Sequence, residues 1–138
     1  MMKWFERNLW ASWTILIITA GYILYISSLT KDPTQIIMFP YKSIIYHFGI
    51  FMLLTFFSMI SFSKGGKRRD YIFVGILFSM LYAVSDEFHQ VFIAGRSASL
   101  GDLLTDSIGI ILAGISYLNR HKKAIKNRAS ISRDKIQN

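Results

Sequence analysis

The chain contains no cysteine, only two prolines and only eight acidic residues among its 138. The lack of cysteine excludes disulfides and thiolate metal sites. No pattern typical of a hydrolase or transferase is present, and no motif of a nucleophilic serine appears. Apolar residues make up 52% of the chain, and the mean hydropathy is positive. A soluble domain of this size rarely combines such a composition with so little surface polarity, so we expect one small integral membrane domain.

Four apolar segments are long enough to cross a bilayer, which requires about 20 mostly apolar residues in a helix. The predicted helices cover approximately residues 9–29, 41–62, 71–92 and 100–118. The first is longer than the apolar part of a signal peptide, so we interpret it as a retained helix. The sequence therefore predicts an all-α membrane protein, a four-transmembrane-helix bundle over residues 1–118. Residues 119–138 form a polar, basic cytoplasmic tail that we expect to be partly disordered or to lie on anionic lipid.

The distribution of lysine and arginine predicts how the bundle is oriented. Four crossings place thirteen of the sixteen basic residues on one side: two before the first helix, four between the second and third, and seven in the tail. Only Lys31, Lys42 and Arg96 lie on the other side. Because cytoplasmic loops carry the excess of Lys and Arg, both termini are predicted to be cytoplasmic. The net charge of +8 is then explained by basic residues that stay on the cytoplasmic side and contact anionic lipid. We therefore expect no nucleic acid as a partner.

Half of the acidic residues lie inside or at the rim of apolar helices. They are Asp86, Glu87, Asp102 and Asp106. A carboxylate at the centre of a bilayer costs about 2.5–3.5 kcal/mol, so four of them in one small chain require a reason. In the predicted orientation all four lie toward the outer surface, where His47 and Arg96 also lie. The sequence therefore predicts a polar pocket that opens to the outer leaflet.

Helical spacing refines the third helix of this pocket. Residues four apart share a face, so Asp86 and Gln90 lie on one stripe, with His89 beside them. Glu87 is rotated by about 100° from Asp86, so we expect it to meet a different partner.

The fourth helix shows the same spacing. Asp102 and Asp106 share a face with Gly109 and Ala113, and small residues on that face allow another helix to approach closely.

Each of these residues also has a purely structural interpretation. His47 alone is more often a packing or interfacial histidine than a catalytic one. Asp86 and Arg96 can form an ion pair that holds the outer turn against the bundle. Asp102 can serve only to stabilise the N-terminus of its helix. Buried polar networks can be wholly architectural, so the functional hypothesis depends on the number of groups at one depth.

The sequence offers one set of candidates for ligand binding, and these are His47, Asp86, Glu87, His89, Gln90, Arg96, Ser99, Asp102 and Asp106. A divalent metal is the cofactor that we consider, and the candidate ligands for it are His47, Asp86, His89 and Asp106. No catalytic residue is assigned.

At these positions the sequence resembles the VanZ-like membrane protein family. Residues 86–99, Asp-Glu-Phe-His-Gln-Val-Phe-Ile-Ala-Gly-Arg-Ser-Ala-Ser, are similar to the family's D-E-x-H-Q-x-F-x-P-G-R-x-x-S segment. Residues 102–109 continue into its D-x-x-x-(D/N)-x-x-G, and Lys42 with His47-Phe48 resembles its K-x-x-H-F with one extra residue. Ala94 replaces the usual proline, so the outer turn is expected to be less rigid. The likeness covers about residues 41–114.

The resemblance implies a setting and a phenotype. The family's namesake is associated with low-level resistance to the glycopeptide teicoplanin, and no settled biochemical activity carries over. It implies the plasma membrane of a bacterium, with a Gram-positive one expected.

Three functions fit these observations. The first is a non-enzymatic envelope protein whose pocket binds a lipid head group, a cell-wall precursor or a lipid-anchored antibiotic, with Arg96 on phosphate or carboxylate. The second is an intramembrane enzyme that uses acid/base groups or a metal on a lipid-linked substrate. The third is a proton or ion pathway through the acidic cluster. Four short helices enclose only a narrow pathway unless the protein forms a homo-oligomer. We favour the first.

Overall fold

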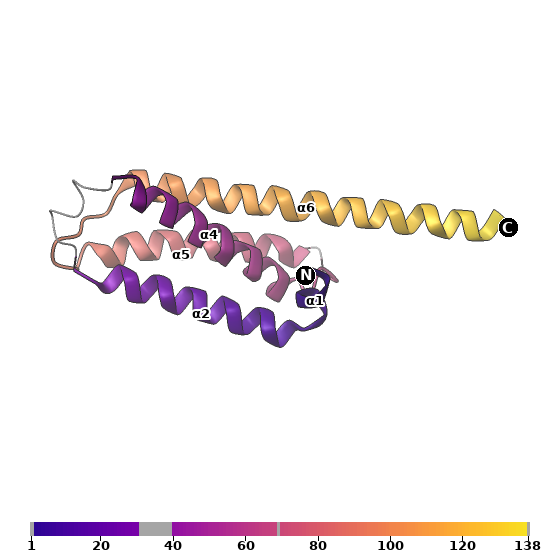
Figure 1. The fold of residues 1–138 in the computed structure, drawn as a ribbon, viewed down its shortest axis with the longest axis horizontal. Coiled ribbons are helices and arrows are strands. Elements are labelled where there is room, and N and C mark those ends of the chain that lie inside the picture. Colours follow the sequence, from indigo (N-terminus) through magenta and orange to yellow (C-terminus); the bar gives the residue numbers. More distant parts are fainter. Residues whose placement is uncertain (1, 31–39, 69, 138) are drawn as a thin grey trace.

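The computed structural model describes residues 2–30, 40–68 and 70–137, and every regular element in these ranges is an α-helix. The long helices are α2 (Leu9–Ser28), α4 (Pro40–Phe62), α5 (Asp70–Gln90) and α6 (Leu100–Gln137). All four are long and apolar enough to cross a membrane. Figure 1 shows them side by side in one bundle. The predicted fold class is confirmed, and the first three helices begin and end within two residues of the predicted ranges.

A short helix that the sequence analysis did not predict precedes the bundle. This helix, α1 (Met2–Arg7), lies at the end of the bundle that also holds the start of α2. The Phe5 ring packs edge-on against Phe57 of α4, with ring centroids 5.2 Å apart. Ser12 of α2 donates a hydrogen bond to the Phe5 carbonyl at 3.0 Å. These contacts bind the N-terminal segment to the body of the protein.

The fourth helix is longer than expected. We predicted its end near residue 118, but α6 continues to Gln137, and Figure 1 shows its last turns projecting beyond the other helices. At 1.5 Å per residue its 38 residues span roughly 57 Å, far more than a bilayer core of about 30 Å. The sequence predicts an end near residue 118 because apolar residues become sparse after it. That stretch contains neither glycine nor proline and many good helix formers, so the helix continues.

The outer surface of the bundle is apolar. Ile17 on α2, Phe73 and Leu81 on α5 and Leu104 on α6 each expose more than 60% of their surface. Side chains of this kind around four spanning helices are suited to lipid contact and not to water. The protein is therefore a multi-pass membrane protein.

Inside the bundle α4 and α5 each pack against all the other long helices, and α4 is the central element because its contacts are the more extensive. Two glycines allow its closest contacts. A Cβ on Gly75 of α5 would lie 2.7 Å from the Met59 backbone nitrogen, and one on Gly109 of α6 would lie 2.5 Å from the Phe48 carbonyl oxygen. The close approach predicted for the small-residue face of α6 is thus confirmed, and its partner is α4.

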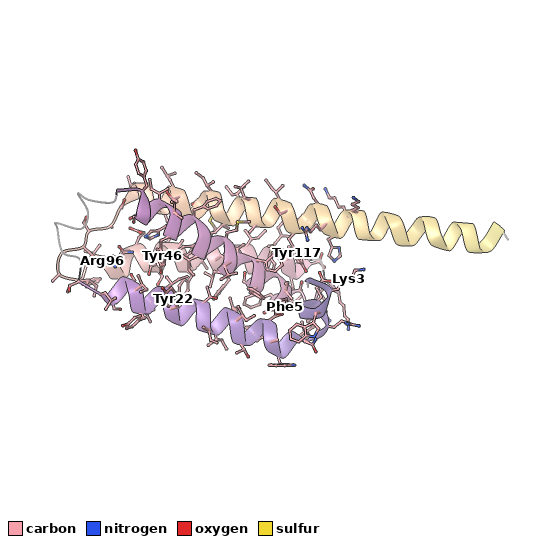
Figure 2. All side chains as sticks on the ribbon, in the orientation of Figure 1. Lys3, Phe5, Tyr22, Tyr46, Arg96 and Tyr117 are labelled. Carbon is pink, nitrogen blue, oxygen red and sulfur yellow. The ribbon has the colours of Figure 1, made fainter. Side chains whose placement is uncertain are left out.

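The two ends of the bundle differ in chemistry. At one end α2 and α5 finish while α4 and α6 begin; we call this the site end. Figure 2 shows Arg96 and Tyr46 there, whereas Lys3, Phe5 and Tyr117 lie toward the opposite end. Because neighbouring helices run antiparallel, the last turns of α2 and α5 lie at the same level as the first turns of α4 and α6.

Candidate functional site

A histidine and an aspartate from different helices form the centre of the site. His47 of α4 and Asp106 of α6 are 3% and 0% exposed, and His47 Nδ1 lies 2.9 Å from Asp106 Oδ1. An ionised carboxylate only accepts hydrogen bonds, so the imidazole proton lies on Nδ1 when Asp106 is ionised. The ring stacks on Phe51 one turn further along α4, which fixes its plane. The close packing at Gly109 brings these two helices near enough for this contact.

Glu87 of α5 reaches the same centre from a third helix. It is 5% exposed, and its Oε2 accepts a hydrogen bond from the Ser99 backbone N–H at 2.7 Å. Glu87 also interacts electrostatically with His47 and Asp106. The turn before α6 therefore orients this carboxylate toward the pair on α4 and α6.

Asp86, the neighbour of Glu87, is held within its own helix. Its Oδ2 accepts a hydrogen bond from Gln90 Nε2 at 3.0 Å, which confirms that residues 86 and 90 share a face. Asp86 and Gln90 are both at least 95% buried, and Asp86 interacts electrostatically with Asp106. As predicted, Asp86 and Glu87 have different partners.

One pattern is common to the three carboxylates. Each is held through one oxygen, while the other is buried and has no hydrogen-bond partner; these free atoms are Asp86 Oδ1, Glu87 Oε1 and Asp106 Oδ2. Burial of an unpaired carboxylate oxygen is costly, because no water replaces the lost hydration. One ligand atom each from His47, Glu87 and Asp106 also lies within 4.8 Å of the others. The arrangement is thus able to bind a cation or a group that donates hydrogen bonds.

Asp102 combines a structural and an electrostatic role at the start of α6. Its backbone N–H donates to Ser99 Oγ at 3.2 Å, so Ser99 caps the helix, and its carboxylate lies in the first turn, where negative charge is favourable. The same carboxylate accepts from Ser43 Oγ at 3.4 Å and lies 3.8 Å from His47 Nε2. The capping interpretation fits the geometry, and Asp102 also borders the site.

Arg96 does not face these acids. Its Nε and Nη2 donate to the carbonyl oxygens of Leu29 and Ile26, at 2.9 and 2.6 Å. Ile26 lies in the last turn of α2, where its carbonyl also accepts from the Leu29 N–H at 3.3 Å, and Leu29 is the residue that follows the helix. The guanidinium therefore closes the C-terminus of α2. Asp86 and Arg96, both within the described ranges, form no ion pair.

His89 also points toward α2. Its Nε2 lies 3.0 Å from Ser28 Oγ, and Tyr82, two turns earlier, donates to the Ala20 carbonyl at 2.7 Å. These contacts hold α5 against α2. His89 is therefore a structural contact in this arrangement, although it was among the candidate metal ligands.

The structure thus divides the predicted candidates. It brings together His47, Glu87 and Asp106, places Asp86, Gln90, Ser99 and Asp102 next to them, and turns His89 and Arg96 toward α2. Sequence reasoning missed Tyr46, whose buried hydroxyl has no partner and whose ring packs edge-on against His47. Its position directly before His47 was the available signal. It also left Glu87 out of the metal set, because the choice of helix face cannot be made without the partner helices.

The fold and the site define a four-span membrane protein with an acidic, histidine-containing cluster buried at one end of its bundle. A family model described as VanZ/LLP1 matches residues 3–121, which is most of the chain. The protein belongs to the VanZ/LLP1 family, as its motifs over residues 86–109 had indicated. The comparisons with curated proteins and with solved structures found no match.

Proposed function

We propose that this protein is a cell-envelope membrane protein whose site end binds the head group of an outer-leaflet lipid or of a lipid-linked cell-wall precursor. One observation carries the proposal: three buried carboxylates, on Asp86, Glu87 and Asp106, each leave one oxygen without a partner. A ligand that supplies hydrogen-bond donors or positive charge offsets the cost of burying these atoms.

The orientation of the bundle supports an external ligand. The excess of lysine and arginine around α1, in the loop before α5 and along the end of α6 favours a cytoplasmic location for that end. The site end then faces the outside of the plasma membrane. Family membership supports a bacterial envelope, with a Gram-positive host and low-level teicoplanin resistance as the setting that the family name implies.

The acids, and not Arg96, are the groups that we assign to head-group recognition. The guanidinium donors of Arg96 are directed to carbonyls at the end of α2, whereas carboxylate oxygens of Glu87 and Asp106 remain available as acceptors. Amines and hydroxyls of a head group are the donors that such acceptors bind. Their charge-assisted hydrogen bonds are stronger than neutral ones, particularly away from water.

A groove between α4 and α6 supports a ligand with an acyl chain. It has a volume of about 480 Å³ and a mostly apolar lining that includes Gly49, Phe56, Ala113 and Tyr117. Gly49 lies only two residues beyond His47, so a chain in the groove would begin near the level of the site. Apolar grooves of this size suit hydrocarbon.

Binding to purified protein in nanodiscs tests the proposal. The probes are phosphatidylethanolamine, phosphatidylglycerol and a lipid-linked peptidoglycan precursor, each titrated against wild type, Glu87→Gln and the control Asp70→Asn, which alters an exposed acid at the other end of α5. We expect saturable binding of at least one probe by wild type and by the control, and binding at least tenfold weaker for Glu87→Gln. If no probe binds saturably, or if Glu87→Gln binds like the control, the proposal is wrong.

The resistance phenotype is tested in cells. Expression in a susceptible Gram-positive host is expected to raise the inhibitory concentration of teicoplanin severalfold, and Glu87→Gln is expected to remove this gain at equal protein level. An equal gain from the variant would separate the phenotype from the site.

A second candidate function follows from the His47–Asp106 pair. An imidazole held by a buried carboxylate at 2.9 Å is an arrangement that general bases use, because the carboxylate orients the ring and stabilises its charged form. The protein would then be an intramembrane enzyme acting on a lipid-linked envelope substrate. Turnover of the precursor by wild type, lost in His47→Gln, supports this function; binding without product removes it.

A further inference from the structure

We infer that the site end holds a divalent transition-metal ion, bound by one ring nitrogen of His47 and one carboxylate oxygen each of Glu87 and Asp106. These ligands come from α4, α5 and α6, so the ion would join three helices that the chain connects only through turns at the two ends. Where the inference concerns what the ion does for a head group, it rests on the function proposed above.

The spacing of the three ligands suits one ion. Their ligand atoms lie within 4.8 Å of one another. Three ligand atoms on one first-row ion lie about 3.0–3.6 Å from one another, since each bond is roughly 2.0–2.2 Å long and the angles between bonds are about 90–120°. The widest separation in the cluster, at most 4.8 Å, therefore needs to close by about 1–2 Å, a distance on the scale of side-chain rotations.

A second observation, independent of the clustering, points to a ligand. Asp106 and Glu87 are 0% and 5% exposed, and each has one buried oxygen, Oδ2 and Oε1, that no hydrogen bond reaches. Acidic groups on a protein surface remain hydrated and need no ion, but these two are within a membrane bundle. Their unpartnered oxygens are the atoms that a cation would bind.

The surroundings orient the ligands as the surroundings of metal sites do. The Ser99 N–H holds Glu87 through its other oxygen, and the stacking of His47 on Phe51 sets the plane of the imidazole. Asp102 adds a further carboxylate oxygen 3.8 Å from His47 Nε2, close enough to contribute charge or to bind a water on the ion. An ion would enter in exchange for the proton that His47 shares with Asp106.

The donor set defines the class of metal. One imidazole with two or three carboxylates suits Mn²⁺, Fe²⁺ or Zn²⁺ better than Ca²⁺, which prefers oxygen ligands alone, and the absence of cysteine removes thiolate sites. Three protein ligands leave coordination positions open. Phosphate or hydroxyl oxygens of a head group can occupy them, so the ion would supply the positive charge that Arg96, directed to α2, does not.

Metal binding to the full-length protein in detergent tests the inference. Purified protein is incubated with Mn²⁺ or Zn²⁺ and desalted, and bound metal is measured by mass spectrometry; affinity is measured by electron paramagnetic resonance titration with Mn²⁺. The variants are Glu87→Gln and His47→Gln. The matched control is His89→Gln, which removes a histidine at the same level whose ring contacts Ser28 of α2.

We expect about one ion per chain in wild type and in His89→Gln, with affinity at least tenfold lower in both site variants. Mn²⁺ is expected to raise the unfolding temperature of wild type and His89→Gln but not of Glu87→Gln. Glu87→Gln preserves size and shape, so it gives the decisive comparison if His47→Gln does not fold. Wild type without metal above the buffer level overturns the inference, as does equal affinity in Glu87→Gln.

The same preparations separate this inference from the proposed function. Head-group binding that persists unchanged in EDTA, with no metal in the protein, overturns the metal site and leaves the proposed function intact. Stoichiometric metal in a protein that binds none of the lipid probes supports the metal site and refutes head-group binding.

Discussion

The close approach of α4 and α6 at Gly109 links the packing of the bundle to the geometry of the site. A Cβ at this position would lie 2.5 Å from the Phe48 carbonyl oxygen, and ordinary contact begins near 3.4 Å, so Gly109→Ala must separate the two backbones by 0.9 Å (3.4 minus 2.5). Phe48 follows His47 directly, and Gly109 lies three residues after Asp106. If the whole shift reaches the pair, the 2.9 Å contact between His47 and Asp106 lengthens to 3.8 Å and is lost.

Two opposing effects set the size of the change. Overpacking of a tight interface costs about 1–3 kcal/mol, whereas replacing glycine by alanine within a helix returns roughly 0.5–1 kcal/mol. We therefore expect Gly109→Ala to lower the free energy of unfolding by up to about 2.5 kcal/mol relative to wild type. The matched control is Gly21→Ala on α2, where an added Cβ meets nothing within 4 Å and the helix effect alone remains.

Thermal unfolding in detergent, followed by tryptophan fluorescence, measures the stability of both variants. Histidine-selective ¹⁵N NMR reports whether His47 keeps its hydrogen bond. We expect a lower Tm and an altered His47 signal for Gly109→Ala, and an unchanged or higher Tm with an unchanged signal for Gly21→Ala. A Gly109→Ala protein as stable as the control, with the His47 signal of wild type, would refute the account of how packing positions the site.

Three further predictions concern the ends of the helices, the groove and the orientation. Arg96→Gln is expected to lower the free energy of unfolding by about 1–3 kcal/mol, because two charge-assisted hydrogen bonds to the end of α2 are lost. The loss is measured as a lower Tm with bound Mn²⁺ unchanged, and loss of metal with an unchanged Tm would contradict this role. Gly49→Leu is expected to fill the groove without disturbing the fold, since an added Cβ there meets nothing within 4 Å. Binding of long-chain lipid should weaken while binding of its water-soluble head group does not, and equal weakening of both would remove the groove from the proposal. Because the chain has no cysteine, single Ser97→Cys and Lys67→Cys variants can be labelled in intact cells with an impermeant maleimide, and we expect labelling only at residue 97. Labelling only at residue 67 would show that the predicted orientation is wrong and that the site end lies in the cytoplasm.

Residue spacing was sufficient for the relations within a single helix. Asp86 and Gln90 share a face and form a hydrogen bond because residues four apart on an α-helix are neighbours. The same regularity correctly separated Glu87 from Asp86. It did not indicate which of the two faces turned toward His47, because that depends on how α5 is rotated between α2 on one side and α4 and α6 on the other. The metal set inferred from sequence therefore contained Asp86 and His89, whereas the ligand atoms that converge include Glu87.

Arg96 shows the same limit at a helix end. On sequence grounds, a lone arginine in a turn near four acids suits either an ion pair with Asp86 or contact with an anionic ligand. The folded chain brings the C-terminal end of α2 to the same place, and the carbonyls of Ile26 and Leu29 bind the guanidinium instead. The competing acceptors are backbone atoms almost 70 residues away in the chain, and nothing in the local sequence identifies them.

Apolar runs, basic loops and the acids within helices determined, from the sequence alone, that this is a four-span membrane protein with polar groups gathered at one level. The sequence determines these features because hydrocarbon thickness and the cost of burying charge act on each segment separately. The choice of His47, Glu87 and Asp106 as the centre, and of Arg96 and His89 as contacts to α2, was decided only by the tertiary structure. Helix rotation and packing at Gly75 and Gly109 set these pairings, and both depend on every neighbouring helix at once.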